Sequence, residues 1–305
     1  MVGPFRAPPE KTEAPMTRTT VLTVGSLHYD IMVAAPHLPR RDETAVGTAW
    51  FPKFGGKGGN QAVAAAQAGA PSRMVGAVGG DDFGSFLRGA LQAAGVDDHR
   101  VATIPDTGSG MSVAIVDQKG DYAATIVSGA NQRIDPAGLA QDALWADVGL
   151  LLLQNEIPET VNLAACRQAR QRRIRTVLNA APARALPAAL VPLIDILVVN
   201  AIEAEMMGTA AVNSLPAAEA AARRLADRFA AVIVTAGALG LAGIGPDGPA
   251  FRVPARPVPV VSSHGAGDAF VGSLAAALLQ GASLAEAADR ASLAAARHVS
   301  GQPLP

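Results

Sequence analysis

The sequence has little of what marks secreted, membrane or nucleic-acid-binding proteins. Its single cysteine excludes an internal disulfide, and 25 basic against 26 acidic residues leave a formal net charge of −1. With only 4% aromatic residues and no long basic face, nucleic acid is not an expected partner. The longest uncharged stretch, residues 229–246, is interrupted by glycines and predicts two strands joined by a turn, not a membrane span. We therefore expect a cytoplasmic protein with neither a membrane nor a nucleic-acid partner.

The first 19 residues also lack the apolar segment of a signal peptide. They carry four prolines among charged residues, which predicts a disordered tail. Residues 20–305 contain no internal repeat and no low-complexity linker, so we expect one continuous domain. The lone Cys166 falls in a pattern that predicts a helix over 159–171, where a buried structural thiol is expected.

What the sequence does contain is a repeated alternation of short branched runs and alanine-rich segments. The branched runs are nearly free of polar residues, which is typical of parallel strands buried on both faces. Two segments, 31–54 and 105–128, instead alternate polar and apolar residues and predict half-exposed antiparallel strands. We therefore expect an α/β fold with a mostly parallel central sheet, helices on both faces and a small second sheet. The branched runs lie at 21–24, 74–78, 150–153, 174–178, 194–199 and 232–235, and helical patterns at 61–68, 83–94 and 217–229.

The sharpest chemical signal is the segment SHGAGD at residues 263–268. A branched run at 258–261 predicts a strand before it, and a helical pattern follows it. Gly265–Gly267 would then lie at a helix N-terminus, where backbone N–H groups and the helix dipole favour an anion such as a phosphoryl group. Asp268, in the first helical turn, is a candidate base for a hydroxyl proton. The alternative is a helix cap preceded by a glycine turn.

A second glycine-rich segment, FGGKGGNQ at residues 54–61, opens a predicted helix. Its glycines let a ligand approach the backbone, and Asn60 offers an amide to sugar hydroxyls. It is not a Walker A loop, because no Ser or Thr follows Lys57. It is not a dinucleotide-binding loop either, because Gln61 stands at the third glycine position. The alternative is a plain flexible turn before the helix.

Three further segments follow predicted strands. Asn200 and Glu203 lie one helical turn apart, so they could face one magnesium–water shell or form an ordinary helix cap. Residues 235–240 could place backbone against a nucleotide or make an ordinary hairpin turn. Asp30 is an acceptor for paired sugar hydroxyls if it faces a cleft, and a turn residue if it does not.

In their order and spacing, these segments resemble the PfkB carbohydrate kinase family, and within it the ribokinase branch, over about residues 21–298. The resemblance implies a ribokinase-like α/β fold and an ATP-dependent kinase that acts on a sugar hydroxyl. Residues 20–305 would form the kinase domain, with a discontinuous lid at about 31–54 and 105–128. The most specific motifs are 55–66 and 265–268, and the supporting ones are 80–82, 129–131, 178–184 and 200–203.

The family's site residues carry over to this sequence position by position. The resemblance implies that Asp268 is the catalytic base and that the anion hole consists of Gly265, Ala266 and Gly267. It assigns sugar binding to His28, Asp30, Gly56, Lys57, Asn60 and Glu156. It assigns ATP and its Mg²⁺ to Asn200, Glu203, Thr235, Gly237 and Gly240, with Mg²⁺ near Asn200 and Glu203. Lids of the ribokinase branch often pair, so a homodimer through the lid is the expected assembly.

The sequence departs from the family pattern at three places. His28 stands where the ribokinase branch usually has an Asn that contacts the sugar. Ser262 replaces the Asp that belongs to the K⁺ site of cation-activated members, and His264 brings an imidazole to the entrance of the anion hole. The segment after residue 298 is also short of the family's usual last helix. We therefore expect activity to depend little on K⁺, with a protonated His264 as one substitute for the missing positive charge.

The leading functional hypothesis is the phosphorylation of ribose to ribose 5-phosphate. One alternative is another PfkB-type kinase that acts on a hexose or a nucleoside. A second is a catalytically weak sugar- or nucleotide-binding protein, which the intact motif at residues 265–268 opposes. A third is a nicotinamide-dependent oxidoreductase, which the missing dinucleotide fingerprint opposes.

Overall fold

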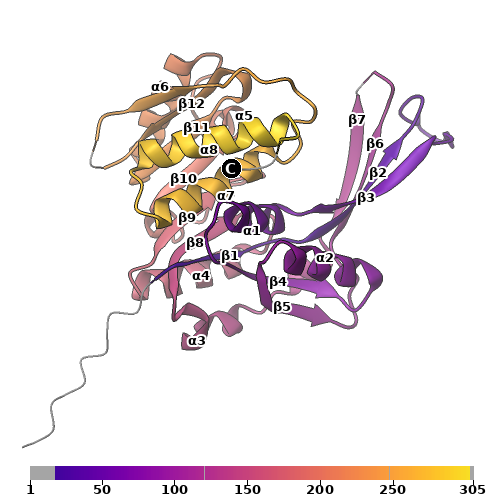
Figure 1. Cartoon of the computed structure of the whole chain (residues 1–305), viewed down its shortest axis with the longest axis horizontal. Helices are drawn as coiled ribbons and strands as arrows, with labels where there is room; N and C mark the ends of the chain where they lie inside the picture. The colour runs from indigo at the N-terminus through magenta and orange to yellow at the C-terminus, as the bar shows by residue number, and fades with distance from the viewer. Residues whose placement is uncertain (1–17, 120, 247, 303–305) are drawn as a thin grey trace, which may run out of the picture.

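The computed structural model describes residues 18–119, 121–246 and 248–302 (Figure 1). The predicted disordered tail therefore lies outside the described residues as far as residue 17. Thr19 is already joined to the body, because its N–H donates to the carbonyl of Asp147 (2.9 Å). In the described part of the chain, no helix is both long and apolar enough to cross a bilayer.

The main body is built on one large mixed sheet, as the branched runs predicted. Its strand order is β13-β12-β11-β10-β9-β8-β1-β4-β5, and all neighbours from β11 to β5 are parallel. Only β12 and β13 add antiparallel pairs at one edge. The strands are β1 Thr20–Val24, β4 Ser72–Gly79, β5 Asp97–Ile104, β8 Val148–Gln154, β9 Arg175–Asn179, β10 Ile196–Asn200, β11 Ala231–Thr235, β12 Gly240–Ile244 and β13 Phe251–Pro254.

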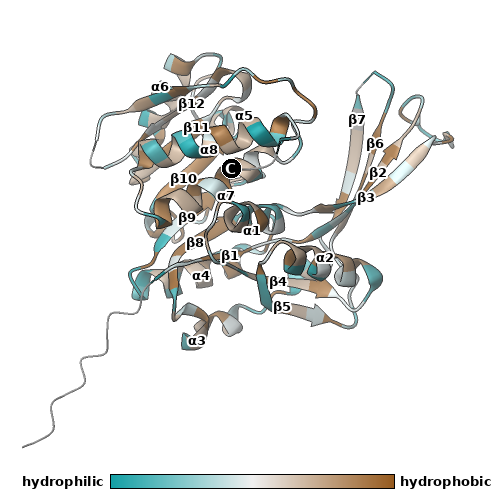
Figure 2. Cartoon of the chain, viewed as in Figure 1, coloured by the Kyte–Doolittle hydropathy of each residue, from teal (hydrophilic) through white to brown (hydrophobic). Residues whose placement is uncertain are grey.

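Helices cover both faces of this sheet. Because side chains alternate across a strand, Leu150 and Leu152 pack on one face with Phe270, whereas Leu151 and Leu153 join the core of the other face. In Figure 2 the strands of the main sheet are largely hydrophobic, while α8 shows hydrophilic patches. One face carries α1 Lys57–Gln67, α2 Asp82–Ala93, α7 Ala266–Leu279 and α8 Leu284–Val299; the other carries α3 Asp142–Trp145, α4 Glu159–Gln171, α5 Ala201–Met206 and α6 Leu215–Ala226.

Helices α1 and α7 lie against each other at very short range (Figure 1). Gly272 of α7 permits this approach. A Cβ at that position would lie 2.6 Å from Cβ of Ala64 and 2.9 Å from the backbone N of Ala65, and would also strike the carbonyl oxygen of Gln61. The first turns of both helices are thereby held side by side.

A second, small sheet stands away from the main body, as the alternating segments predicted (Figure 1). Its order is β3-β2-β6-β7, from β2 His28–Ala34, β3 Ala49–Gly55, β6 Met111–Val116 and β7 Tyr122–Val127. The pairs β2–β3 and β6–β7 are antiparallel, but the central pair β2–β6 is parallel, which differs from the expected all-antiparallel arrangement. It exposes large apolar side chains, including Trp50 (65% exposed) and Ile126 (58% exposed).

The predicted strand at residues 258–261 is wrong. This segment is irregular, and Val260 and Val261 are 72% and 73% exposed. Pro257 and Pro259 cannot donate to a strand ladder, and β13 already forms that edge of the main sheet. The β-branched residues of this segment were therefore not sufficient to predict a strand.

The prediction for Cys166 is confirmed. The residue is fully buried in α4, a helix with the predicted bounds 159–171. Burial disfavours the thiolate and raises the pKa of Cys166 to about 12.

Candidate active site

The predicted site residues gather at the carboxyl ends of the parallel strands. Gly25 and Ser26 follow β1, Glu156 follows β8, and Asn200 and Thr235 end β10 and β11. The N-termini of α1 and α7 lie at the same edge, which places the two glycine-rich segments together. Ligand sites of open α/β sheets form at this edge, because the loops that follow the strands converge there.

Asp268 is buried in the first turn of α7 and is held by two amides of α1. Nε2 of Gln61 donates to its Oδ1 (2.9 Å), and Nδ2 of Asn60 makes a longer contact with its Oδ2 (3.4 Å). The residue is 8% exposed. The catalytic candidate and the sugar-binding candidate Asn60 are thus brought into direct contact.

The environment of Asp268 raises its pKa. Burial is the main cause and disfavours the carboxylate, whereas the ammonium of Lys57 and the donors Gln61 and Asn60 oppose it; the charge of Glu156 adds to the rise. The dipole of α7 favours ionisation of a carboxyl group in its first turn, but burial has the larger effect on the pKa of Asp268. A carboxylate with a raised pKa is a stronger base, which suits proton abstraction.

The N-terminus of α7 is shaped by Gly265. Its φ of +84° reverses the chain direction so that the helix begins at Ala266, whose N–H donates to the carbonyl of Ser263 (3.3 Å). The first N–H groups of a helix lack intrahelical acceptors, and a Cβ at Gly267 would meet no atom within 4 Å. This open helix end fits a phosphoryl group, as the sequence predicted for an anion hole.

The segment after β1 and the first turn of α1 are packed backbone to backbone. Gly56 has a φ of +86°, and a Cβ there would lie 2.8 Å from backbone atoms of Ser26, Leu27 and His28. The N–H of Gly59 donates to the carbonyl of Ser26 (2.9 Å). The glycines of this motif therefore serve a close approach that any side chain would prevent.

Glu156 ties these two segments to the end of β8. Its Oε2 accepts a hydrogen bond from the hydroxyl of Ser26 (2.5 Å) and one from the N–H of Lys57 (2.9 Å). Nδ1 of His28 lies 3.8 Å from the same oxygen. Three residues assigned to the sugar, His28, Lys57 and Glu156, are thus neighbours.

Asp30 and His28 stand on β2, where the small sheet meets the main body. Oδ1 of Asp30 accepts a hydrogen bond from the hydroxyl of Ser112 (2.5 Å), and the carboxylate lies against the backbone of Gly55. His28 is 4% exposed, and its Nε2 has no hydrogen-bond partner among residues 18–119, 121–246 and 248–302. A buried ring nitrogen of this kind is normally paired, so a ligand hydroxyl is a fitting partner.

Asn200 and Glu203 form the helix cap that was left open as an alternative. Oδ1 of Asn200 accepts from the N–H of Glu203, and Oε2 of Glu203 accepts from the N–H of Asn200, both at 2.8 Å. Burial raises the pKa of Glu203, opposed by the N–H of Asn200 and the charge of Lys57. A cation near this carboxylate would reverse that effect.

Thr235 ends β11 and Gly240 begins β12, and the connection between these antiparallel strands contains one turn of 3₁₀ helix, η4 Gly237–Leu239. Both glycines have positive φ values, +55° and +111°. A Cβ at Gly237 would meet no atom within 4 Å, so a ligand can approach its backbone. The connection is therefore a hairpin turn, as one of the two alternatives proposed, and the open space at Gly237 leaves room for a nucleotide.

Ser262 and His264 occupy the exposed loop before α7. His264 is an exposed residue, yet partial burial of its ring lowers its pKa, and the charge of Lys53 adds to this. The lowered pKa favours neutral imidazole and opposes the expectation that a protonated His264 supplies positive charge. The carbonyl of His264 is instead contacted by Nε2 of His298 from α8 (2.9 Å).

Several polar residues that shape the site were not predicted from the sequence. Ser26 and Ser112 bind the two carboxylates Glu156 and Asp30, as described above. Asn131 pairs twice with the backbone of Leu27, and so fixes the path from β1 to β2 (2.9 and 2.8 Å). Gln61 was considered only as a substitute for a glycine, although it contacts Asp268. Asn131 lies in one of the family motifs, and that was the only signal for it.

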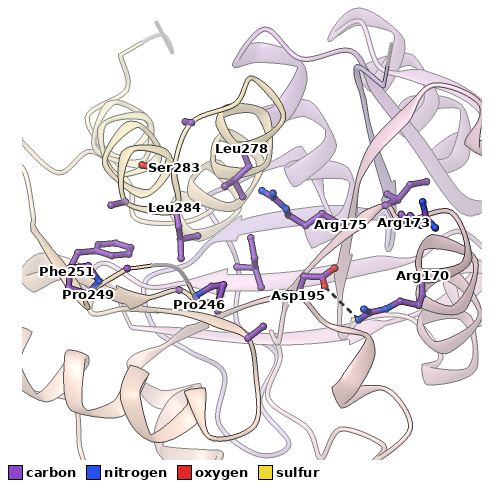
Figure 3. Close-up of a pocket in the computed structure, with 18 residues that line it drawn as sticks. Arg170, Arg173, Arg175, Asp195, Pro246, Pro249, Phe251, Leu278, Ser283 and Leu284 are labelled. Carbon is purple, nitrogen blue, oxygen red and sulfur yellow. Dashed lines mark ion pairs between the residues drawn. The ribbon is translucent and has the colours of Figure 1, made fainter. Parts of the chain in front are cut away.

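A cavity of about 760 Å³ lies at the opposite ends of the same strands. Arg175, Asp195 and Ala231 line it, at the amino ends of β9, β10 and β11, together with Phe251 and apolar residues of α7 and α8. Figure 3 shows this cavity, with an ion pair between Arg170 and Asp195 (3.6 Å). None of the predicted site residues contributes to it, so the candidate active site is a separate feature of the fold.

Metal chemistry in this site would depend on the nucleotide. In the ranges that the structure describes, no three His, Cys, Asp or Glu side chains gather closely enough to hold a metal ion. Mg²⁺ is commonly bound by one or two carboxylates together with substrate phosphates, and Glu203 is one buried carboxylate in reach of such a site. The residues present fit a magnesium ion that arrives with ATP.

Comparisons with known proteins agree with this geometry. A family model described as pfkB family carbohydrate kinase matches residues 18–302. The ribokinase of Bacillus subtilis is 34% identical over 281 residues, which cover 92% of each chain. The deoxyribokinase of Salmonella typhi is 31% identical over 287 residues, covering 92% of this chain and 93% of that protein. The structure of Arabidopsis thaliana ribokinase complexed with ribose and ATP matches with a TM-score of 0.85 at 27% identity, covering 93% of both chains.

Proposed function

The chain belongs to the pfkB family of carbohydrate kinases, and we propose that its sugar substrate is ribose, converted to ribose 5-phosphate. That it is an ATP-dependent carbohydrate kinase follows from the family. The choice of ribose is supported by the ribokinases among its relatives, at 31–34% identity. The observation that carries the proposed chemistry is the buried Asp268 beside the open N-terminus of α7.

In the proposed reaction Asp268 acts as the base. Its carboxylate takes the proton of the sugar hydroxyl as that oxygen attacks the γ-phosphorus of ATP. The bond between the γ-phosphorus and the bridging oxygen breaks, and ADP leaves. Phosphoryl transfer has a loose transition state with charge on the equatorial oxygens, and the N–H groups at the start of α7, from Gly265 to Gly267, are placed to stabilise that charge.

We assign the sugar to the residues of β2 and of the first turn of α1. Acceptors and donors for hydroxyl groups come from the carboxylate of Asp30, the amide of Asn60 and Nε2 of His28, which is unpaired within the described ranges. Gly56, Lys57 and Glu156 complete this side. We assign the nucleotide to Asn200, Glu203, Thr235, Gly237 and Gly240. The carboxylate of Glu203 would help to hold Mg²⁺, which would neutralise charge on the phosphates.

The test is a panel of sugars with ATP and Mg²⁺, following ADP release and locating the phosphate by ³¹P NMR. The panel contains ribose, 2-deoxyribose, a hexose and a nucleoside. We expect the highest kcat/KM for ribose and a phosphate on its 5-hydroxyl. A higher kcat/KM for 2-deoxyribose, the hexose or the nucleoside would refute ribose while leaving the kinase assignment in place.

The base assignment has its own test. Asp268→Asn keeps the size of the side chain but removes the proton acceptor, so we expect kcat to fall about 10²–10⁴-fold with little change in the binding of ATP or sugar. Turnover within a few-fold of the unmodified protein would show that Asp268 is not the base.

We also propose that the small sheet acts as a lid and pairs with the lid of a second copy. Trp50 and Phe51 on its edge strand β3 are 65% and 55% exposed, and Ile126 and Val127 on β7 add 58% and 52%. Exposed apolar area of this kind favours a protein interface. Trp50→Glu with Phe51→Glu should convert a dimer into a monomer in light scattering coupled to gel filtration, and an unmodified protein that is monomeric at high concentration would refute the pairing.

A further inference from the structure

A chain of buried amide side chains leads from the core of the main sheet to Asp268. Gln61 of α1 and Gln154 of β8 are 0% exposed, and Asn179 of β9 is 8% exposed. Nε2 of Gln61 donates both to Oδ1 of Asp268 (2.9 Å) and to Oδ1 of Asn179 (3.0 Å). Such fully buried polar groups cost free energy unless they are paired, so their presence in the core calls for a reason.

The orientation of the Gln61 amide is set by its neighbours. Nε2 of Gln154 donates to Oε1 of Gln61 (2.8 Å), which leaves the NH₂ group of Gln61 facing the carboxylate. The main-chain carbonyl of Gln154 in turn accepts a hydrogen bond from Nδ2 of Asn162 (2.8 Å), which holds this end of β8 in place. Asn179 is anchored through a bond from its Nδ2 to the carbonyl of Val198 (3.3 Å). The donor to Asp268 is therefore fixed to the ends of two central strands.

This anchoring treats the two oxygens of Asp268 differently. Oδ1 is held at 2.9 Å by a fully buried donor. Among the residues that the structure describes, Oδ2 has only the 3.4 Å contact with Asn60, a sugar-binding candidate. A carboxylate fixed through one oxygen keeps the other oriented for proton transfer, and a displacement of about 1 Å can cost about 10²-fold in rate.

We propose that Gln61 is the positioning residue of the catalytic base: it holds Asp268 by Oδ1, directs Oδ2 toward the substrate hydroxyl and favours the ionised carboxylate. The proposal deepens the proposed function, because it rests on Asp268 being the base. Gln61 itself touches neither sugar nor nucleotide in this assignment.

The same bond bears on the pH range of activity. The titratable groups around Asp268 are Lys57 on α1, Glu156 after β8, Glu203 on α5 and His264 in the loop before α7. Burial raises the pKa of Asp268, and the Gln61 donor lowers it. Removing the donor raises this pKa further. Because the base must be ionised, activity is lost as pH falls through the pKa of Asp268. The acidic limb of the pH–rate profile should therefore move to higher pH when the donor is removed.

The central experiment is the pH profile of kcat/KM for Gln61→Met, a change that keeps the side-chain length and removes both the donor and the acceptor. We expect kcat at neutral pH to fall about tenfold or more, the cost of one hydrogen bond to a charged group, with KM changed less than about twofold. The acidic limb should lie at higher pH than in the unmodified protein. An unshifted limb would overturn the proposal.

A second variant, Gln61→Glu, tests the proposal even if Gln61→Met folds poorly. Gln61→Glu keeps the shape and the acceptor for Gln154 but places a second carboxyl against Asp268. Two adjacent carboxyls resist ionising together, so the acidic limb should move even further up than in Gln61→Met. A limb that stays in place in this variant would also overturn the proposal. Gln67→Met, at an exposed position on the same helix α1, is the matched control and should change neither kcat nor the limb.

The double variant separates the positioning role from the base assignment. If Gln61 acts through Asp268, adding Gln61→Met to Asp268→Asn should lower kcat less than about twofold further. A full tenfold loss in that background would refute action through Asp268. If Asp268→Asn alone keeps turnover within a few-fold, the proposed base has failed, and that outcome is distinct from a failure of the Gln61 proposal.

Discussion

Gly272→Ala is the sharpest test of how the two halves of the site are held together. Gly272 lies where α7 contacts α1, and a Cβ there would come within 2.6 Å of Cβ of Ala64 and 2.9 Å of the backbone N of Ala65. Carbon atoms in favourable contact are about 3.5–4.0 Å apart, so the helices must separate by about 1 Å. Backbone cannot move aside as the end of a flexible side chain can.

Two opposing terms set the size of the effect on stability. Alanine within a helix is favoured over glycine by about 1 kcal/mol. Overpacking of a close-packed interior costs about 1–3 kcal/mol, and more where backbone must shift. Backbone atoms must shift here, so we take the upper end of that cost, about 2–3 kcal/mol, and expect the free energy of unfolding to fall by about 1–2 kcal/mol. Separating α1 from α7 also lengthens the 2.9 Å bond between Gln61 and Asp268, so kcat should fall by up to about 10²-fold.

Urea unfolding and steady-state kinetics measure the two consequences. Gly89→Ala is the matched control, because Gly89 lies within helix α2 and a Cβ there would meet no atom within 4 Å. That variant should gain up to about 1 kcal/mol and keep its kcat. If Gly272→Ala is as stable and as active as Gly89→Ala, then the close approach of α1 and α7 does not constrain the site, and the reasoning fails.

Three further predictions address the sugar, the cation and acid stability. Asp30→Ala should raise KM for the sugar far more than KM for ATP, by the equivalent of about 1–3 kcal/mol, because sugar hydroxyls lose a buried charged acceptor; equal losses for both substrates would point to a general distortion. Activity in K⁺ should be less than tenfold higher than in an equal concentration of a large organic cation, because Ser262 offers a neutral hydroxyl to a hard cation. Although partial burial opposes it, hydrogen bonds from Arg73 and His99 lower the pKa of Asp97 to about 2. Its stabilisation is therefore present above about pH 4 and lost between about pH 4 and pH 2. The stability lost is about 1 kcal/mol, because the Arg73–Asp97 pair is partly exposed. Acid unfolding curves of Asp97→Asn should not show this loss.

The fold was readable from the sequence because its signals are local. Near-continuous apolar runs such as Leu150–Leu153 can bury all their side chains only if helices cover both faces of the sheet. This pattern predicted the parallel sheet correctly. The segment 258–261 shows the limit of that reasoning. Its valines favour a strand, but a strand also needs a hydrogen-bonded partner. Pro259 cannot donate to a ladder, and β13 already forms that edge of the sheet.

The candidate site was predictable only in part, for a different physical reason. Glycines such as Gly56 and Gly265 mark backbone conformations that other residues disfavour, so they reveal where chain segments or ligands come close. The polar residues that orient the site, Gln61, Gln154 and Asn179, lie in separate helices and strands. Each looks like an ordinary amide in the sequence, and only the folded chain shows that they contact one another. Burial of Asp268, which controls its pKa, is likewise a property of the assembled core.

The contact between α1 and α7 also has a consequence for how the protein is made. Gln61 and Asp268 are separated by 207 positions along the chain, so their hydrogen bond closes a very large loop. Closing such a loop is entropically unfavourable until the intervening sheet has formed, and contacts of this range form slowly. Strands β1 to β11 emerge from the ribosome before residue 268 does. A partly synthesised chain can therefore contain the small sheet, Asp30 and Asn60 while it still lacks its base. The return of phosphorylating activity during refolding should accordingly lag behind the recovery of helical and sheet content.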